Sequence, residues 1–103
     1  MRAVLQALRE HHADVLQHLQ VKQAFVENPK RFEEMHLNAE EVADGLLFDW
    51  SKNLVTPDTM RLLLELCPAA GLSEAIKGMW NGEAINNTEN RAVLHVALRH
   101  PDG

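Results

Sequence analysis

Three histidines and an aspartate near the start of the chain are the first residues whose types could do chemistry. His11, His12, Asp14 and His18 together could suggest a metal site. A helix that binds a metal through two histidines needs them four residues apart, so that both rings project from one face. His11 and His18 are seven residues apart, and His12 projects elsewhere. The spacing therefore predicts surface and boundary histidines and no metal ligand.

The candidate nucleophile and the candidate acid–base groups are equally weak. Cys67 would need a neighbouring base and an electropositive setting to react. It falls on the apolar stripe of a predicted helix, which is typical of a small buried residue. Glu33-Glu34 and Glu40-Glu41 lie in polar stretches, whereas acid–base catalysis needs a carboxylate in a pocket. We expect no catalytic residue, no cofactor-binding residue and no cofactor in this chain.

Two short motifs have simpler explanations than a binding or modification site. Lys52, within Ser51-Lys52-Asn53, could bind phosphate, but the glycine-rich backbone cradle of a phosphate site is missing. We interpret this stretch as a polar loop between a strand and a helix. Asn86-Asn87-Thr88 matches the N-glycosylation pattern. Without a secretory signal we interpret Thr88 as a helix cap instead.

The densest set of polar residues lies near the C-terminus. Arg91, His95 and Arg99 are spaced four apart and would line one face of a helix, where they could reach an anionic ligand. Glu83 and Glu89 offer partners of opposite charge. We favour an ion-pair network that docks this helix over a ligand site.

Composition limits the classes of protein to which the chain can belong. Its 103 residues suffice for one small domain, and a hydrophobic content of 46% allows a core. A formal net charge of −5 without a basic cluster argues against nucleic-acid or anionic-membrane partners. No apolar stretch is long enough for a signal peptide or a membrane span. A single cysteine excludes an internal disulfide and fits a reduced, cytoplasmic setting.

The elements that would position these residues are mostly helical. Apolar spacing predicts a helix from Arg2 to about Val26, in which Ala24 to Val26 either extend it or begin a second short helix. Asn28-Pro29 ends this pattern, and Arg31-Phe32 should form a turn. The expected apolar stripe comprises Leu5, Leu8, Val15, Leu16 and Leu19.

The middle of the chain predicts a small β-hairpin. Leu46 to Trp50 has strand character after Gly45, and Met35-His36-Leu37 is its expected partner. The loop between them spans residues 39–44, which could alternatively form a helical turn.

Three more helices are predicted after the hairpin. The first begins with Thr56 as N-cap, Pro57 and Asp58, and ends at Pro68 and Gly71. Ser73 should cap a second, which turns Ile76, Met79 and Trp80 inward and ends before Gly82. The expected apolar stripe of the first comprises Met60, Leu63, Leu64 and Cys67.

The last predicted helix runs from Glu89 to about Arg99, with Thr88 as its cap. It would be apolar on almost every side, and such a helix is normally buried on every side. We therefore expect further protein to cover it. Its apolar residues are Ala92, Val93, Leu94, Val96, Ala97 and Leu98.

Several of these segments resemble, in order and spacing, the N-terminal region of the glucose-6-phosphate isomerase family. Trp50 and Trp80 stand where tyrosine or phenylalanine is more usual, Cys67-Pro68 replaces a commoner helix end, and the family's chains are several hundred residues long. The matching segments are Phe25, Asn28-Pro29, Arg31-Phe32, Asp49-Trp50-Ser51-Lys52-Asn53 with Thr56, Met79-Trp80, Gly82-Glu83-Ala84-Ile85-Asn86 and Thr88 to Arg99.

The resemblance implies an enzyme that interconverts glucose 6-phosphate and fructose 6-phosphate. In the family a glutamate moves a proton between C2 and C1 of the opened sugar through a cis-enediol, without a metal or organic cofactor. The family's catalytic groups lie downstream of the motif that matches here. The resemblance thus gives Arg91 and His95 a packing role.

We therefore expect residues 1–103 to be a single N-terminal segment, mainly α with a small β-hairpin (α+β), of a larger α/β sugar-isomerase fold. The segment should lack the catalytic domains, be inactive alone and buttress the remainder of the parent enzyme, a cytoplasmic homodimer that binds the sugar phosphate. The alternatives are a free-standing helical interaction module that uses Ala92 to Leu98, and a small-molecule sensor that uses Arg91, His95 and Arg99.

Overall fold

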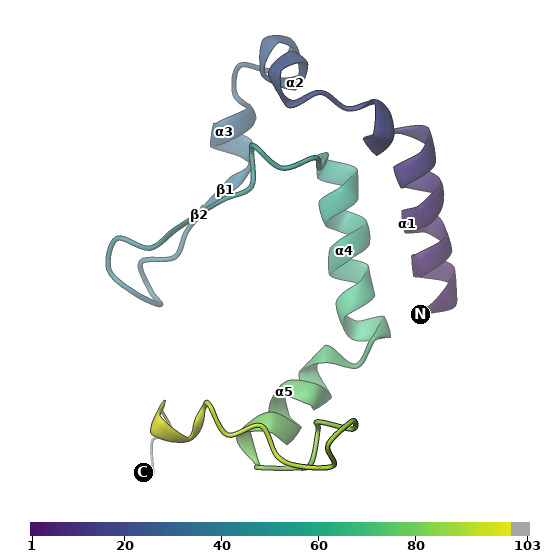
Figure 1. Ribbon diagram of the computed structural model, residues 1–103. Helices are drawn as coiled ribbons and strands as arrows, with labels where there is room; N and C mark the ends of the chain where they lie inside the picture. Colours follow the sequence, from purple (N-terminus) through teal and green to yellow (C-terminus); the bar gives the residue numbers. More distant parts are fainter. Residues whose placement is uncertain (100–103) are drawn as a thin grey trace. The chain divides into compact units, whose positions relative to one another are not determined.

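The computed structural model describes residues 1–99 and, for Arg99, the backbone alone. The described part is mainly helical with one small hairpin, as the sequence predicts (Figure 1). Contacts divide the chain into an N-terminal unit, Arg2–Leu63, and a C-terminal unit, Leu64–Gly103 with Met1. The elements are α1 (Arg2–Asp14), η1 (Leu16–His18), α2 (Val21–Glu27), α3 (Arg31–Glu34), β1 (His36–Asn38), β2 (Leu47–Asp49), α4 (Pro57–Ala69), α5 (Leu72–Trp80) and η2 (Ala97–Arg99).

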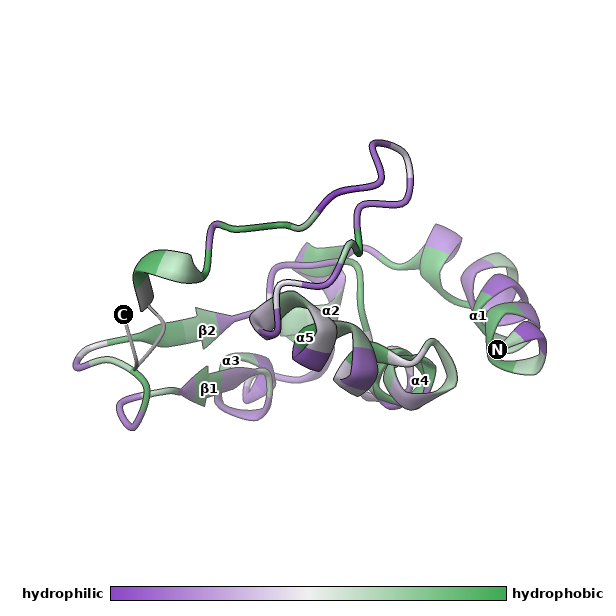
Figure 2. Ribbon diagram, turned by 90° about the horizontal axis from the view of Figure 1, so that it is seen from below, coloured by the Kyte–Doolittle hydropathy of each residue, from purple (hydrophilic) through white to green (hydrophobic). Residues whose placement is uncertain are grey.

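The first helical stretch is broken, so the prediction of one helix up to Val26 is wrong and its alternative, a second short helix, is confirmed. Leu19 and Gln20 have extended backbone between η1 and α2. Of the predicted stripe, Leu5, Leu8, Leu16 and Leu19 are half-buried, and Val15 is exposed. Figure 2 shows apolar residues spaced between polar ones along α1.

The chain turns sharply after α2, which ends at Glu27 as Asn28-Pro29 predicts. The Oδ1 atom of Asn28 accepts a hydrogen bond from the backbone N–H of Lys30 at 3.1 Å, which closes a turn of the kind that asparagine favours. The expected turn at Arg31-Phe32 is instead the four-residue helix α3. This helix fixes the position of Arg31, which is buried.

The predicted hairpin is confirmed. Strands β1 and β2 pair antiparallel with Leu37 opposite Phe48, and the N–H of Trp50 donates to the carbonyl of Met35 at 3.0 Å. The loop also holds the helical turn that was its alternative, because the N–H groups of Val42 and Ala43 both donate to the carbonyl of Ala39.

Helix α4 begins at the predicted cap. The N–H of Thr59 donates to Thr56 Oγ1 at 3.2 Å, and the N–H of Thr56 donates to Thr59 Oγ1 at 2.9 Å. This reciprocal pair satisfies two backbone donors at the helix start, with threonine in the place of the usual glutamate. The predicted inner stripe is wrong at Leu63 and Leu64, which are exposed, and Leu62, expected off the stripe, is buried; Met60 and Cys67 of the stripe are half-buried. Both faces of α4 are apolar, so periodicity could not select the buried one.

The ends of α4 and α5 use glycines with a left-handed backbone. Helix α4 passes Pro68 by one residue, and Gly71 (φ 70°) then precedes α5, so Ser73 lies inside the first turn and is not the predicted cap. Gly82 (φ 71°) ends α5, as predicted. The N–H of Gly82 donates to Met79 and that of Glu83 to Gly78, which is the Schellman pattern.

The predicted helix over residues 89–99 is wrong, since the described backbone holds only the short η2 there. Asn86 Oδ1 instead accepts hydrogen bonds from the N–H groups of Thr88 and Glu89 and from the Thr88 hydroxyl. An asparagine that binds the second and third following N–H groups in this way can also start a helix, but Asn90 has a left-handed backbone (φ 51°), which turns the chain back before a helix can form. Asn86 and Arg91 then pair as an isolated antiparallel bridge. The apolar residues that follow are not buried, and Leu94 is 64% exposed.

Candidate functional site

The best-formed polar cluster of the described structure is built around the guanidinium group of Arg31. This side chain is buried, although arginine rarely is. Its Nε donates to the carbonyl of Ser51 at 2.7 Å, and its Nη2 donates to the carbonyls of Asn53 and Val55 at 3.1 and 2.9 Å. The guanidinium carbon lies 5.8 Å from the centroid of the Phe25 ring. Arg31 therefore fixes the loop between β2 and α4.

The same loop is shaped from within by Asp49. Its Oδ1 accepts hydrogen bonds from the N–H of Ser51 at 2.9 Å and from Ser51 Oγ at 2.6 Å, and its Oδ2 pairs with Lys52 Nζ. The Lys52 ammonium and the Ser51 donors favour the charged carboxylate and lower the pKa of Asp49 from 3.8 to about 2. Ser51 is fully buried, so its hydroxyl orders the loop and is not accessible as a nucleophile.

Lys52 is engaged with groups of the chain itself. Besides Asp49, its Nζ lies 3.1 Å from Ser51 Oγ and 5.3 Å from the centroid of the Phe32 ring. Phe32 in turn stacks on His36 with ring centroids 4.6 Å apart. This arrangement agrees with the interpretation of residues 51–53 as a polar loop between a strand and a helix.

The histidine-rich segment is divided between a partly buried contact and the surface. His11 Nε2 lies 2.7 Å from Thr59 Oγ1, and its Nδ1 lies 3.8 Å from Asp58 Oδ2, so α1 lies beside the start of α4 (Figure 1). His12, Asp14 and His18 are exposed and do not join this contact. Within residues 1–99, no three His, Cys, Asp or Glu side chains lie close enough together to hold a metal ion.

The other candidates stay apart. Cys67 is partly buried on α4. Glu34 accepts a hydrogen bond from Asn28 and Glu40 one from Asn38, and both carboxylates are exposed. Neither carboxylate pair lines the hollow between η1 and α2 or the hollow at the end of α5.

The predicted row of Arg91, His95 and Arg99 does not form, because the helix that would align them is absent. Arg91 pairs with Glu89 at 3.1 Å, His95 is exposed, and the side chain of Arg99 lies outside the described residues. Glu83, the other expected partner, instead places its carboxylate beside buried Gly78.

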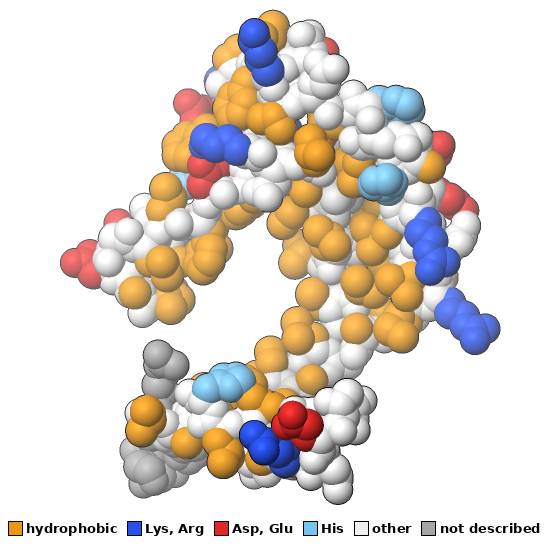
Figure 3. Space-filling view, in the orientation of Figure 1, with side chains coloured by type: hydrophobic (Ala, Val, Ile, Leu, Met, Phe, Trp, Pro, Cys, Tyr) orange, Lys and Arg blue, Asp and Glu red, His pale blue; other side chains and the backbone are white. Residues whose placement is uncertain are grey.

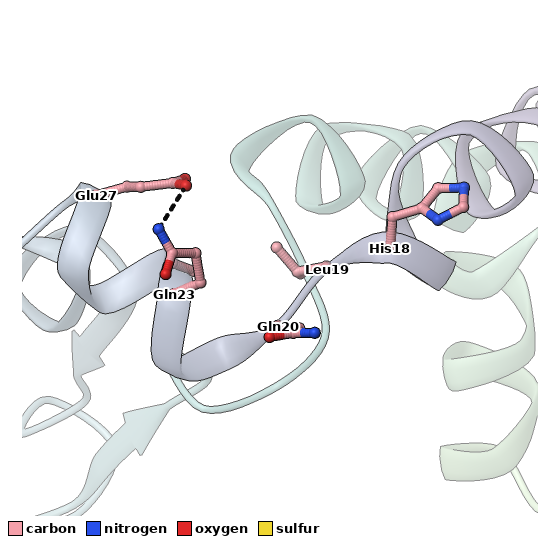
Figure 4. A pocket seen from close by; sticks show the side chains of 6 residues that line it. His18, Leu19, Gln20, Gln23 and Glu27 are labelled. Carbon is pink, nitrogen blue, oxygen red and sulfur yellow. Dashed lines mark hydrogen bonds between the residues drawn. The ribbon is translucent and has the colours of Figure 1, made fainter.

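Hollows among the described residues include the following two. One, of about 150 Å³, lies between η1 and α2, where Gln23 hydrogen-bonds Glu27 and His18 lies apart from both (Figure 4). The other, of about 320 Å³, is in the C-terminal unit and is mainly apolar. Its lining comprises Met79, Trp80, Asn81, Gly82, Leu94, Val96 and Ala97. No described helix is both long and apolar enough to cross a bilayer.

Comparison with known proteins bears on the same segments. The family model "Phosphoglucose isomerase" matches residues 49–103, and thus starts at the Asp49 whose carboxylate orders the loop before α4. The match covers more than half of the chain.

The chain belongs to the phosphoglucose isomerase family. Glucose-6-phosphate isomerases of Stutzerimonas stutzeri (44% identity over 97 residues), Pseudomonas aeruginosa PAO1 (47% over 92) and Roseiflexus castenholzii (49% over 94) are among its relatives. The matches cover 94%, 89% and 91% of this chain but only 17%, 16% and 17% of the relatives. The chain thus spans about a sixth of the length of these family members.

Within this phosphoglucose isomerase segment, sequence reasoning missed the long-range contacts of Arg31 and of His11. Arg31 stood in the quoted resemblance but received no role, and His11 was interpreted as a surface or boundary residue. No local signal distinguishes Arg31 in the sequence, because the carbonyls that bind it lie 20 to 24 residues away. The spacing of His11 from Thr59, 48 residues, is invisible to local patterns.

Proposed function

We propose that this chain is the N-terminal structural segment of a glucose-6-phosphate isomerase and that it stabilises the catalytic part of that enzyme without taking part in the chemistry. The intact enzyme would interconvert glucose 6-phosphate and fructose 6-phosphate by proton transfer through a cis-enediol. It would do so as a cytoplasmic homodimer.

One observation supports the structural role most strongly: little of the apolar surface is buried. Of the described apolar residues, only Met35, Ala39 and Leu62 are buried, although 46% of the chain is hydrophobic. Figure 3 shows apolar side chains, in orange, at the surface of the hairpin and of α4. Side chains more than half exposed include Val26, Leu37, Val42, Phe48, Leu54, Leu64, Leu94 and Leu98.

Such surface is costly in water at about 25 cal/mol per Å², and contiguous apolar patches mark sites that another protein surface covers. The polar clusters also support a structural role. Arg31, Asp49 and His11 are engaged inside the chain, so each contributes to the shape of the segment.

A chimera tests the proposal. This chain would replace the corresponding N-terminal residues of the Pseudomonas aeruginosa PAO1 enzyme, and a coupled assay would measure turnover of fructose 6-phosphate. We expect an active chimera and an inactive isolated chain. The combined substitution Leu37→Asp and Phe48→Asp should reduce the amount of active chimera, whereas Asn38→Asp on the same hairpin should not.

Two results would overturn the proposal. The first is turnover by the isolated chain above that of a blank. The second is a chimera with full activity and unchanged stability after both apolar hairpin residues are replaced, because the hairpin would then have no cover to lose.

The alternative of a free-standing helical interaction module required a helix through Ala92 to Leu98. The structure has no such helix: Leu94 and Leu98 are exposed, but the helical face that this module would use does not form. The small-molecule sensor depended on the same helix to align Arg91 with His95.

A further inference from the structure

The C-terminal end of α5 carries a chemically labile dipeptide. Asn81-Gly82 is the one Asn-Gly pair in the sequence. An asparagine loses its amide when the backbone nitrogen of the next residue attacks its Cγ. A glycine in that position has no side chain to shield the nitrogen, whereas Asn53, Asn87 and Asn90 are followed by leucine, threonine and arginine.

The structure leaves this pair open to the reaction. Asn81 and Gly82 are both exposed, and no heavy atom lies within 4 Å of the place where a Cβ on Gly82 would be. Within residues 1–99 the side-chain amide of Asn81 forms no hydrogen bond. Nothing described here therefore holds the amide away from the neighbouring nitrogen.

We propose that Asn81 is the preferred deamidation site of this chain and that the Schellman turn at the end of α5 controls its rate. The Gly82 nitrogen, after loss of its proton, bonds to Asn81 Cγ. The side-chain nitrogen leaves as ammonia, and a five-membered succinimide remains. Water then opens either C–N bond of the ring and yields aspartate or isoaspartate.

Control by the turn follows from the atom that must react. The N–H of Gly82 donates to the carbonyl of Met79 at 3.2 Å, and Asn81 has ψ 0°. Attack on Cγ requires rotation about this ψ and therefore breaks that hydrogen bond. At 3.2 Å the bond is at the long end of the normal range, and a helix end opens locally without unfolding of the whole chain.

Deamidation replaces the neutral amide of Asn81 by a carboxylate, and the surroundings of this position respond to charge. A carboxylate at position 81 lies at the negative end of the α5 dipole and only two residues before another acidic residue, Glu83. It also lies at the rim of the apolar hollow that Trp80 and Leu94 line. Deamidation adds one negative charge to a chain of formal net charge −5 and weakens the end of α5.

Peptide mapping by mass spectrometry of the 103-residue chain, incubated at mildly alkaline pH and physiological temperature, tests the site. Asn87, which is exposed and followed by Thr88, is the internal control. We expect aspartate and isoaspartate to accumulate at Asn81 several-fold faster than at Asn87. Equal or slower conversion at Asn81 would overturn the assignment.

The same incubation in guanidinium chloride tests the control by the turn. Conversion of Asn81 should be several-fold faster in denaturant, because the Gly82–Met79 hydrogen bond is then lost, and Asn87 should change less. Equal Asn81 rates with and without denaturant would overturn the role of the turn. The variant Asn81→Gln should lack the acidic species that isoelectric focusing detects in the parent chain.

Discussion

The N-terminal and C-terminal units differ in the sequence distance over which their polar groups act. In the N-terminal unit, Arg31 donates to carbonyls 20 to 24 residues away, and His11 contacts a threonine 48 residues away. In the C-terminal unit, the bonds that shape the turns at Gly82 and Asn86 link residues close in sequence. Buried polar side chains thus specify tertiary structure in one unit, while local turn chemistry shapes the other.

The substitution with the largest expected effect on stability is Arg31→Ala, which tests the role of buried polar groups in the N-terminal unit. It removes three charge-assisted hydrogen bonds and leaves the carbonyls of Ser51, Asn53 and Val55 without their donor, so we expect a loss of about 3–4 kcal/mol in the free energy of unfolding. Urea denaturation measures it. Arg31→Lys keeps the charge but not the planar fork and should lose less. If Arg31→Ala were as stable as the parent chain, buried polar side chains would not specify the tertiary structure of the N-terminal unit, and the contrast with the C-terminal unit would be lost.

Helix α4 crosses from one unit to the other and allows a matched pair of substitutions. Leu62→Ala, at a buried position, should cost about 3 kcal/mol through lost burial and a cavity. Leu64→Ala, at a position 65% exposed, should stay within about 0.5 kcal/mol. Both changes are the same in helix propensity, so the difference in urea midpoint reports burial alone. Similar costs at the two sites would mean that the N-terminal unit does not hold the tighter core.

A smaller effect is expected for Thr59→Val, which keeps the shape of the side chain but removes its hydroxyl. The change deletes the acceptor for the Thr56 N–H and the partner of His11 Nε2. We expect a loss of about 1–2 kcal/mol, typical of a helix cap. Thr59→Ser keeps the hydroxyl and serves as the control in thermal denaturation. If valine and serine behaved alike, the long-range contact of His11 would contribute nothing.

The smallest effect concerns the pH dependence of the loop before α4. The pKa of Asp49 is lowered from 3.8 to about 2, so the unfolded chain binds the proton at higher pH than the folded chain. The contribution of the carboxylate is therefore fully present above pH 3.8 and is lost as the pH falls toward about 2. Asp49→Asn should flatten the decline of stability over this interval in denaturation curves at several pH values. Parallel declines would show that Lys52 and Ser51 do not favour the charged form.

The sequence predicted the elements whose signals are local. Thr56 caps α4, Asn28-Pro29 ends α2 and Gly82 ends α5, because each residue type has its own backbone preference there. The hairpin was found for the same reason. These elements account for most of the mainly helical fold with its small hairpin.

The predictions that failed share one physical cause. Alternative contacts compete for the same residues, and a local sequence pattern does not show which contact forms. Residues 92–98 are almost continuously apolar, yet the left-handed backbone of Asn90 (φ 51°) and the pairing of Asn86 with Arg91 turn the chain back where a helix was predicted. On α4, Leu62 competes with Leu63 for the core, and tertiary contacts decide the outcome. The polar cluster around Arg31 depends on carbonyls that only the folded chain brings to it.

The reach of Arg31 has a consequence for synthesis on the ribosome. Val55, which supplies one of its acceptors, is added 24 residues after Arg31 itself. Until then the guanidinium has to remain hydrated, since burying it without acceptors is costly. The first three helices of the growing polypeptide can therefore reach their final packing only after the hairpin and the start of α4 have been synthesised. The distant acceptors of the Arg31 side chain impose this order.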